Sequence, residues 1–309
     1  MTKKIFAAGY FGYGNFGDEL ILDIFTKRMR GFRVTHVKHM KTRLFSALKE
    51  IANCDAVVFP GGSVLQDESS SLSLFFYTLV IFTASLLGKP VFMLDSGFEV
   101  RRPLNKKLLR TTLKNTSFIS VRDNTSFALL RSLGLKPFKS ADCAFSLKPF
   151  TPEQVFPPKM IGVIPRGKNT LTEKALKLCK KNWPVAKFKF AVLNPKDLPR
   201  AEQLAGKHVP VIKSLAHAEN FFGSCDFFVL APYHSLVLAV SSGVNFTAVA
   251  YSEKVTNFLT DTRMRDSVFS GKLPEKPAAD NKSRGRGMRI SEEYAFQIFL
   301  NLLKDKLKL

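Results

Sequence analysis

Short apolar runs alternate with longer helical patterns from the N-terminus to the middle of the chain. The runs bounded by glycine, proline or polar residues predict β-strands at 4–9, 34–37, 56–59, 90–94 and 118–121. Helices are predicted at 18–30, 72–87 and 124–133, where apolar residues recur with helical spacing or form one long run. Strands that alternate with helices are typical of βαβ units, so we predict a mainly parallel sheet.

A proline-bearing interval at 148–159 interrupts the alternation and predicts a linker. Beyond it, the same pattern predicts strands at 161–164, 188–193, 227–230 and 246–250, and helices at 172–181, 216–222 and 234–241. The basic segment 271–289 is poor in apolar residues, which indicates a mobile loop. We therefore predict an N-terminal Rossmann-like domain over 1–150, a C-terminal one over 151–270, the loop 271–289 and a C-terminal helix over 290–309.

The predicted fold class is α/β, with two Rossmann-like, doubly wound domains facing one another across a cleft. Ligands of open α/β sheets bind beyond the carboxyl ends of the strands, so the loops at those ends hold the candidate site residues. We expect Gly14, Asn15, Asp18 and Gly62 on the first domain's side of this cleft, and Arg166 and His234 on the other.

The charge of the chain narrows the class of partner. Its 309 residues contain 47 Lys and Arg against 25 Asp and Glu, a net charge of +22. Such an excess indicates an anionic partner, which is nucleic acid, a phosphorylated small molecule or an acidic membrane surface. The four cysteines form no Cys-x-x-Cys pair, which is evidence against a zinc ribbon or a disulfide framework.

The location of the protein is predicted from two stretches of the sequence. The N-terminus lacks the pattern of a signal peptide, so we expect a cytoplasmic protein. Residues 72–87 carry no charge, yet they fall short of the about 20 residues that span a bilayer. A buried helix is the plainer interpretation and shallow membrane insertion is the alternative. Together with the cationic excess, this predicts a peripheral protein on the inner face of the plasma membrane.

Two glycine-rich junctions follow predicted strands. Gly12, Gly14 and Gly17 match Gly-x-Gly-x-x-Gly, but the region of the second strand, 35–41, has no carboxylate to bind a ribose, which argues against NAD. Asp18 opens the next helix, where capping is the alternative to a chemical role. Gly61, Gly62 and Ser63 form a second junction, read as an anion nest at a helix start or as an ordinary turn.

Three further residues follow predicted strands. Arg122 is a candidate for substrate binding, and the alternative is an ion pair with Asp142 or another carboxylate. Arg166 suits a bidentate contact to a carboxylate or phosphate. His234 opens a helix and can act as a general acid or base, with capping or packing as the alternative. His36 and His39 lack a third ligand, so no metal site is expected.

Taken together, these stretches resemble the polysaccharide pyruvyl transferase family, and within it the CsaB-type, cell-surface-anchoring branch. The resemblance rests on segments 9–22, 61–77, 119–135, 140–147, 164–167 and 233–259. It implies a GT-B-like fold and transfer of a pyruvyl group from phosphoenolpyruvate to a sugar, which yields a 4,6-ketal. The implied acceptor is a lipid-diphosphate-linked disaccharide that carries N-acetylmannosamine, and the reaction needs no cofactor.

The implied chemistry assigns roles to these residues. His234 would protonate the donor, Asp18 or Asp67 would act on a sugar hydroxyl, and amides and cations would hold the donor anions. The candidates for that binding are Gly14, Asn15, Gly61, Gly62, Ser63, Arg122, Arg166 and Lys254. The sequence departs from the family at Pro232, where an arginine is usual.

Two other classes of function stay open at this stage. One is a GT-B glycosyltransferase that uses a nucleotide sugar, and the other is a non-catalytic basic protein that binds a membrane or nucleic acid. Nucleic acid is not the expected partner, because the charge is dispersed and no binding motif occurs.

Overall fold

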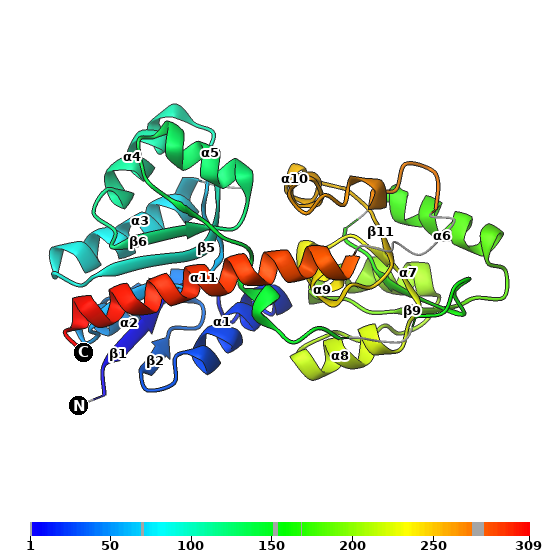
Figure 1. The fold of residues 1–309 in the computed structure, drawn as a ribbon, viewed down its shortest axis with the longest axis horizontal. Helices are drawn as coiled ribbons and strands as arrows, with labels where there is room; N and C mark the ends of the chain where they lie inside the picture. The colour runs from blue at the N-terminus through cyan, green and yellow to red at the C-terminus, as the bar shows by residue number, and fades with distance from the viewer. Residues whose placement is uncertain (1, 69–70, 151–153, 168, 274–280) are drawn as a thin grey trace. The chain divides into compact units, whose positions relative to one another are not determined.

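The chain folds into two compact units in this computed structural model (Figure 1). The structure describes residues 2–68, 71–150, 154–167, 169–273 and 281–309, with side chains from Ser283 in the last range. Unit 1 comprises Met1–Tyr13, Ile21–Ser146 and Ile290–Leu309, and unit 2 comprises Gly14–Leu20 and Leu147–Arg289. The main chain passes between the units more than once, and the crossing at Ser146 and Leu147 is close to the predicted boundary at 150.

A parallel sheet forms the middle layer of unit 1. Its strand order is β2-β1-β3-β5-β6-β7, with β4 paired to β5. Every pairing is parallel. The strands are β1 (Lys4–Ala7), β2 (Arg33–His36), β3 (Ala56–Phe59), β4 (Gly62–Gln66), β5 (Val91–Glu99), β6 (Phe118–Val121) and β7 (Phe138–Lys139).

Helices cover both faces of this sheet, as in doubly wound folds. They are α1 (Phe16–Arg28), α2 (Leu44–Ala52), α3 (Ser71–Leu86), α4 (Pro103–Leu113), α5 (Asn124–Ser132) and α11 (Asn281–Leu307), with the short turns η1 (Met40–Thr42) and η2 (Cys143–Ser146). One apolar core contains α2–α5 side chains such as Tyr77 and Leu109. The other contains Phe25 of α1 and Phe299 of α11.

Unit 2 has a smaller parallel sheet in the order β11-β10-β8-β9. Its strands are β8 (Met160–Ile164), β9 (Lys187–Phe190), β10 (Phe227–Leu230) and β11 (Phe246–Ala248). Its helices are α6 (Thr170–Asn182), α7 (Leu198–Ala205), α8 (Leu215–Gly223), α9 (Tyr233–Ser242) and α10 (Glu253–Asp261), with the turns η3 (Pro195–Asp197) and η4 (Arg265–Ser267). Phe227 and Val229 of the inner strand β10 are fully buried in the core of this unit.

Two predicted segments differ in the structure. Gly62–Gln66 forms strand β4 instead of opening a helix, and helix α3 begins only at Ser71. Helix α11 begins at Asn281, so the last part of the predicted loop 271–289 is helical, whereas 274–280 lie outside the described residues. The start of α11 packs closely against α9 at Gly285, where a Cβ would lie 2.5 Å from the carbonyl oxygen of Val240.

Two expectations from composition can be compared with the fold. All four cysteines are buried and free in this structure. Within the described ranges, no helix has the length and apolar character needed to cross a membrane.

Candidate functional site

The glycine-rich loop after β1 joins unit 2 instead of the unit that contains β1. The amide of Phe16 donates a hydrogen bond of 3.1 Å to the carbonyl of Leu193, which follows β9. A Cβ built on Gly14 would lie 3.8 Å from the ring of Pro195. The expectation that Gly14, Asn15 and Asp18 lie on the opposite domain from His234 is therefore wrong, since all belong to unit 2.

His234 lies against the backbone of the first turn of α1, directly after this loop. A Cβ built on Gly17 would be 1.9 Å from Nδ1 of the imidazole and 2.2 Å from Cε1, so only glycine leaves room for the ring. His234 occupies the first turn of α9 and is half-buried. The positive end of that helix and the loop backbone therefore border the same imidazole.

The first turn of α1 presents a carboxylate in the same unit. The side-chain amide of Asn15 donates to Oδ2 of Asp18, and the amide of Glu19 donates to the carbonyl of Asn15 at 3.2 Å. Both side chains are half-buried. Asp18 thus has the first-turn position expected of a residue that stabilises a helix start, and it remains partly accessible for chemistry.

Arg166 and His234 follow strand ends that lie side by side. Strands β8 and β10 pair Ile164 with Leu230, and the amide of Ala231 donates to the carbonyl of Ile164 at 3.0 Å. Arg166 comes two residues after the end of β8, and His234 comes four after the end of β10. Parallel strands place these loops at one edge of the sheet, where open α/β folds bind their ligands.

The surroundings of Arg166 leave its guanidinium half-accessible. Its Nη1 lies 3.8 Å from Oδ2 of the buried Asp197, and its side chain is 40% exposed. The other oxygen of Asp197 accepts a 3.0 Å hydrogen bond from the amide of Gly167. Asp197 therefore fixes the loop after β8 and orients an arginine that can still reach an anion.

A second cation lies near the start of α9. Nζ of Lys254 is 4.8 Å from the centre of the Tyr233 ring, a cation–π contact. The Tyr233 ring is perpendicular to the imidazole of His234, with the centroids 5.2 Å apart. Lys254 is therefore positioned through Tyr233 at the helix start that also presents His234.

The glycine junction of unit 1 is a strand start. Gly61 and Gly62 have positive φ angles of 145° and 82°, and Gly62 begins β4. The predicted anion nest at a helix N-terminus is therefore wrong, because the following residues pair with β5. Ser63 accepts a hydrogen bond of 2.9 Å from Nη2 of Arg122.

Arg122 forms the ion pair that the sequence left open as an alternative. Its Nη1 lies 2.7 Å from Oδ2 of Asp142, and the two side chains are 1% and 2% exposed. Oδ1 of Asp142 accepts from the amide of Ala144 at 3.1 Å. Since Arg122 also binds Ser63, this pair ties β4, β6 and the turn after β7 together, which is a structural role.

Asp67 also has structural surroundings. Its carboxylate accepts hydrogen bonds from the amides of Arg101 and Arg102, at 2.9 and 3.0 Å, and from the side chain of Asn105 at 2.9 Å. Burial would raise the pKa of Asp67, but the Arg101 amide, Asn105 and the Arg102 amide together hold it below its ordinary value. Its oxygens fix the start of α4, so Asp18 is the better candidate for proton transfer.

The sequence did not reveal a buried acidic pair in unit 1. Glu292 is fully buried and accepts a hydrogen bond from Arg28, and Asp95 accepts one of 3.0 Å from Ser120. Burial raises the pKa of Asp95 to about 7 and that of Glu292 to about 8. The sequence signal for this pair was a carboxylate inside an apolar strand, since Asp95 follows Val-Phe-Met-Leu.

In the part of the chain that is described, no group of His, Cys, Asp or Glu side chains could hold a metal ion.

The fold places the chain in a known structural class. A Listeria monocytogenes protein described as a UDP-N-acetylglucosamine 2-epimerase superimposes with a TM-score of 0.58 at 13% identity, over 98% of this chain and 96% of that one. HepE of Anabaena, in complex with UDP and glucose, gives 0.57 at 10% identity over 99% and 100%. These similarities show a GT-B fold of two α/β domains.

The sequence itself identifies the family within that class. Residues 15–253 match the polysaccharide pyruvyl transferase family, so the chain belongs to this family of transferases. No curated protein matches the sequence. The matched range includes the loop at Gly17, Arg166 and His234.

Proposed function

We propose that this protein transfers the pyruvyl group of phosphoenolpyruvate to two hydroxyls of a sugar and forms a 4,6-ketal during cell-wall polysaccharide synthesis. The proposed acceptor is a lipid-diphosphate-linked disaccharide with N-acetylmannosamine. The observation that carries the proposal is His234 at the start of α9, with its imidazole against the loop at Gly17. It supports the proposal because open α/β sheets bind ligands at this edge, and an imidazole there can donate a proton.

The reaction requires a proton on carbon before the sugar attacks. The imidazolium of His234 donates a proton to the methylene carbon of phosphoenolpyruvate, which leaves an oxocarbenium-like centre at the adjacent carbon. One sugar hydroxyl attacks this centre, and Asp18 accepts its proton. Phosphate then departs with the electron pair of its carbon–oxygen bond, and the second hydroxyl closes the ketal. The two hydroxyl protons balance the new methyl hydrogen and the proton carried by the released phosphate.

The donor needs cations for both its phosphate and its carboxylate. With Pro232 in the place of the family's usual arginine, Arg166 is our first candidate for this contact and Lys254 the second. Both belong to the unit that contains His234. The amides at the start of α9 and of the loop at Gly14 and Asn15 add donors for the same anions.

In unit 1, the turn of Gly61 and Gly62 has structural contacts of its own. The Arg122–Asp142 pair and Ser63 fix the turn of Gly61 and Gly62, next to the carboxyl end of β3. We assign Asp67 to the fold of that region and give it no part in the chemistry.

Calorimetric titration with phosphoenolpyruvate tests the donor. Saturable binding of phosphoenolpyruvate, with none of a UDP-sugar, supports the proposal. Saturation by the UDP-sugar alone would instead favour the alternative function, a glycosyltransferase that uses a nucleotide sugar. Binding and turnover measured with and without a chelator test the expectation that no metal is needed.

A further inference from the structure

Helix α3 carries an apolar stripe on its solvent side. Along its length every third or fourth residue is a large exposed apolar side chain: Leu72 (78%), Phe75 (51%), Leu79 (43%), Phe82 (56%) and Leu86 (71%). The spacing of 3, 4, 3 and 4 residues places them on one helix face. The opposite face, with Tyr77 and Val80, is buried in the core of unit 1. Helix α3 is thus apolar on both faces, although one face meets solvent.

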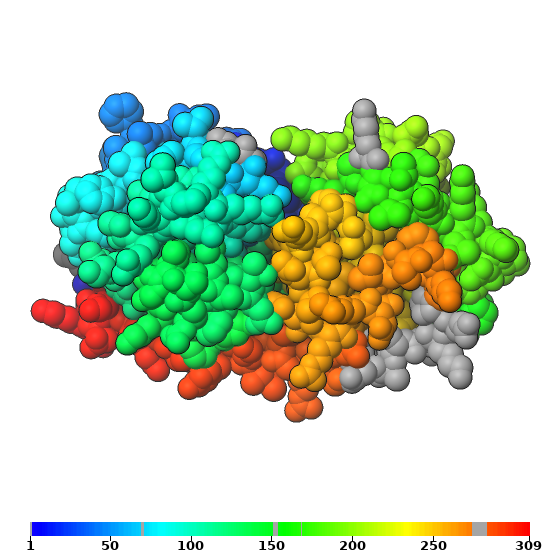
Figure 2. All heavy atoms as spheres, turned by 90° about the horizontal axis from the view of Figure 1, so that it is seen from above, coloured from blue at the N-terminus to red at the C-terminus, as the bar shows by residue number. Residues whose placement is uncertain are grey.

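A cationic helix lies beside this stripe. Helix α4 packs against α3 in the same layer, and Figure 2 shows both on one face of unit 1, α3 in cyan and α4 in turquoise. The exposed side chains of α4 and its flanks include Arg101, Arg102, Lys107, Arg110 and Lys114. Neither helix contains an aspartate or a glutamate. The face therefore combines exposed apolar side chains with exposed cations.

The two helices are joined where the stripe begins. Nη1 of Arg102 donates to Oγ of Ser71 at 2.7 Å, and the side chain of Asn105 donates to the same oxygen at 3.0 Å. Nζ of Lys41 donates to Oγ of Ser73 at 2.7 Å. The bonds from Arg102 and Asn105 hold the first turn of α3 against the start of α4, and the bond from Lys41 ties the same turn to η1. The stripe and the α4 cations therefore keep a fixed relation.

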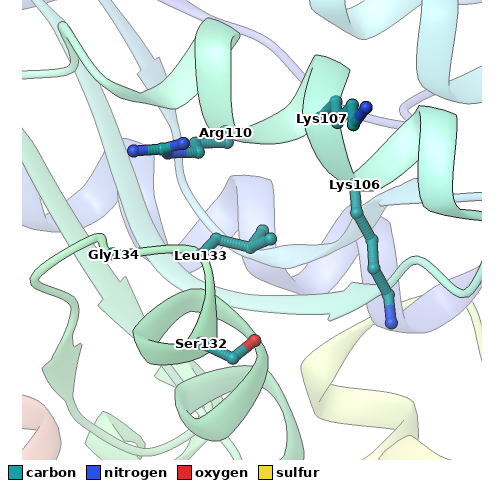
Figure 3. Close-up of a pocket in the computed structure, with 6 residues that line it drawn as sticks. All are labelled: Lys106, Lys107, Arg110, Ser132, Leu133 and Gly134. Atoms are coloured by element: carbon teal, nitrogen blue, oxygen red, sulfur yellow. The ribbon is translucent and has the colours of Figure 1, made fainter.

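The cations of α4 also border a cavity. A shallow cavity of about 360 Å³ is lined by Lys106, Lys107 and Arg110 of α4 and by Ser132, Leu133 and Gly134 at the end of α5 (Figure 3). The charged ends of the three cations point in different directions in Figure 3, so they spread positive charge around the cavity, and Leu133 adds an apolar wall. A phosphodiester with attached hydrocarbon fits both features.

We propose that the α3–α4 face is a docking surface for a bilayer that contains anionic phospholipid. The apolar stripe would enter the boundary between headgroups and acyl chains, while the α4 cations contact lipid phosphates. Charge complementarity favours this occupant over a second copy of the chain. A two-fold interface would bring the same patch of each copy together and oppose cations to cations.

This proposal is independent of the transfer reaction, because its test contains no substrate. The protein would be sedimented with vesicles of phosphatidylcholine alone and with vesicles that contain one third phosphatidylglycerol. We expect binding to the anionic vesicles, reversed by salt, and at least about tenfold weaker binding to the neutral ones.

Matched variants locate the surface. Phe75→Ser with Phe82→Ser removes two exposed rings, and Lys107→Gln with Arg110→Gln removes two cations; each pair should weaken vesicle binding by about tenfold or more. Val185→Ser, at a side chain 86% exposed in unit 2, and Lys174→Gln with Lys177→Gln on α6 are the controls and should bind as the unmodified protein does. Circular dichroism checks that each variant folds.

Three results would overturn the proposal. The first is equal binding of neutral and anionic vesicles, and the second is binding that neither pair of α3 and α4 substitutions weakens. The third is a concentration-dependent dimer in sedimentation velocity that Phe75→Ser with Phe82→Ser abolishes, because the stripe would then be the contact between copies. If the unmodified protein binds anionic vesicles but transfers no pyruvyl group, the result counts against the proposed function and leaves the docking surface intact.

Discussion

The imidazole of His234 lies against Gly17 so closely that a methyl group on residue 17 would overlap the ring, at 1.9 Å from Nδ1. This contact joins the glycine-rich loop at the start of α1 to the start of α9. It explains why a glycine stands in the first turn of α1 although its φ is not positive, since the space for a side chain, and not the backbone conformation, is limiting. The position of the proposed proton donor thus depends on a missing side chain 217 residues earlier in the sequence.

Gly17→Ala should displace the imidazole and reduce turnover by about 10²-fold or more, because a small misplacement of a catalytic group is costly. Donor affinity should change far less, since the cations are not moved. Steady-state kinetics together with donor titration measure both quantities. Gly223→Ala is the matched control, because a Cβ there meets nothing within 4 Å. Equal turnover of the two variants would show that the contact does not matter for catalysis.

His234→Ala should lower turnover by about 10²–10⁴-fold, the usual contribution of a general acid. Donor binding should remain within a few-fold, because the substitution removes a proton donor and not an anchor. His234→Gln tests whether shape alone suffices, and it should be as inactive as the alanine variant. Full activity in either variant would eliminate the mechanism.

Arg166→Ala should weaken phosphoenolpyruvate binding by about 2 kcal/mol, the scale of a charge-assisted hydrogen bond. Arg166→Lys should recover part of the affinity, because it keeps the charge without the planar fork. Arg200→Ala provides a control in the same unit, where the lost partner is Glu173. If both alanine variants bind the donor equally well, Arg166 is not the anchor and Lys254→Ala becomes the variant to measure.

Arg122→Ala should destabilise unit 1 by about 3–5 kcal/mol, because it leaves the buried carboxylate of Asp142 without its partner. Replacing both residues, as Arg122→Met with Asp142→Leu, should cost less than the single substitution. Urea unfolding gives the free energies. A loss of donor affinity with unchanged stability would contradict the structural role and return Arg122 to the substrate-binding set.

The buried pair of Asp95 and Glu292 predicts a pH dependence of stability. Burial raises both pKa values, to about 7 and about 8. The unfolded chain releases these protons near pH 4, so the folded state binds more protons between there and about pH 8. The stability that this pair contributes is complete below about pH 4 and is lost as the pH rises through 7 and 8.

Asp95→Asn should therefore make the decline in stability between about pH 5 and 8 shallower, because it removes one of the two titrating groups. Urea unfolding at several pH values compares the slopes of the variant and the unmodified protein. The control is Asp55→Asn, at a carboxylate whose side chain is 36% exposed. Identical slopes for Asp95→Asn and the unmodified protein would show that the pair does not titrate in this range.

The strands were readable from the sequence where burial on both faces makes a continuous apolar run. Ala56–Phe59 and Phe227–Leu230 are buried at every residue and were predicted at their observed bounds. Gly62–Gln66 was missed because its strand character comes from pairing with β5, a contact that local sequence does not encode. The helical part of 281–289 was missed because its two glycines disfavour a helix, although Gly285 is needed for close packing on Val240.

Only the candidate site residues that directly follow strands could be predicted from the sequence. His234 and Arg166 follow β10 and β8, and the register of those strands places their loops side by side. That the loop at Gly17 belongs to the same unit was not predictable, because it depends on one hydrogen bond to Leu193 and on the space left by a glycine. For Arg122 and Asp67 the position after a strand suggested a role in the site, but a charged residue there can equally hold neighbouring elements together, as the contacts of both do.

The most direct test of the central claim is a reaction in deuterated water that contains the protein, phosphoenolpyruvate and a diphosphate-linked disaccharide with N-acetylmannosamine. Mass spectrometry and proton NMR would follow the saccharide. The proposed mechanism predicts a pyruvyl ketal whose methyl group carries one deuterium from solvent, with release of one phosphate per ketal. It also predicts that His234→Ala forms no ketal while still binding the donor. Formation of the labelled ketal by His234→Ala at the unmodified rate, or transfer of a sugar from a UDP-sugar with no pyruvyl product, would contradict it.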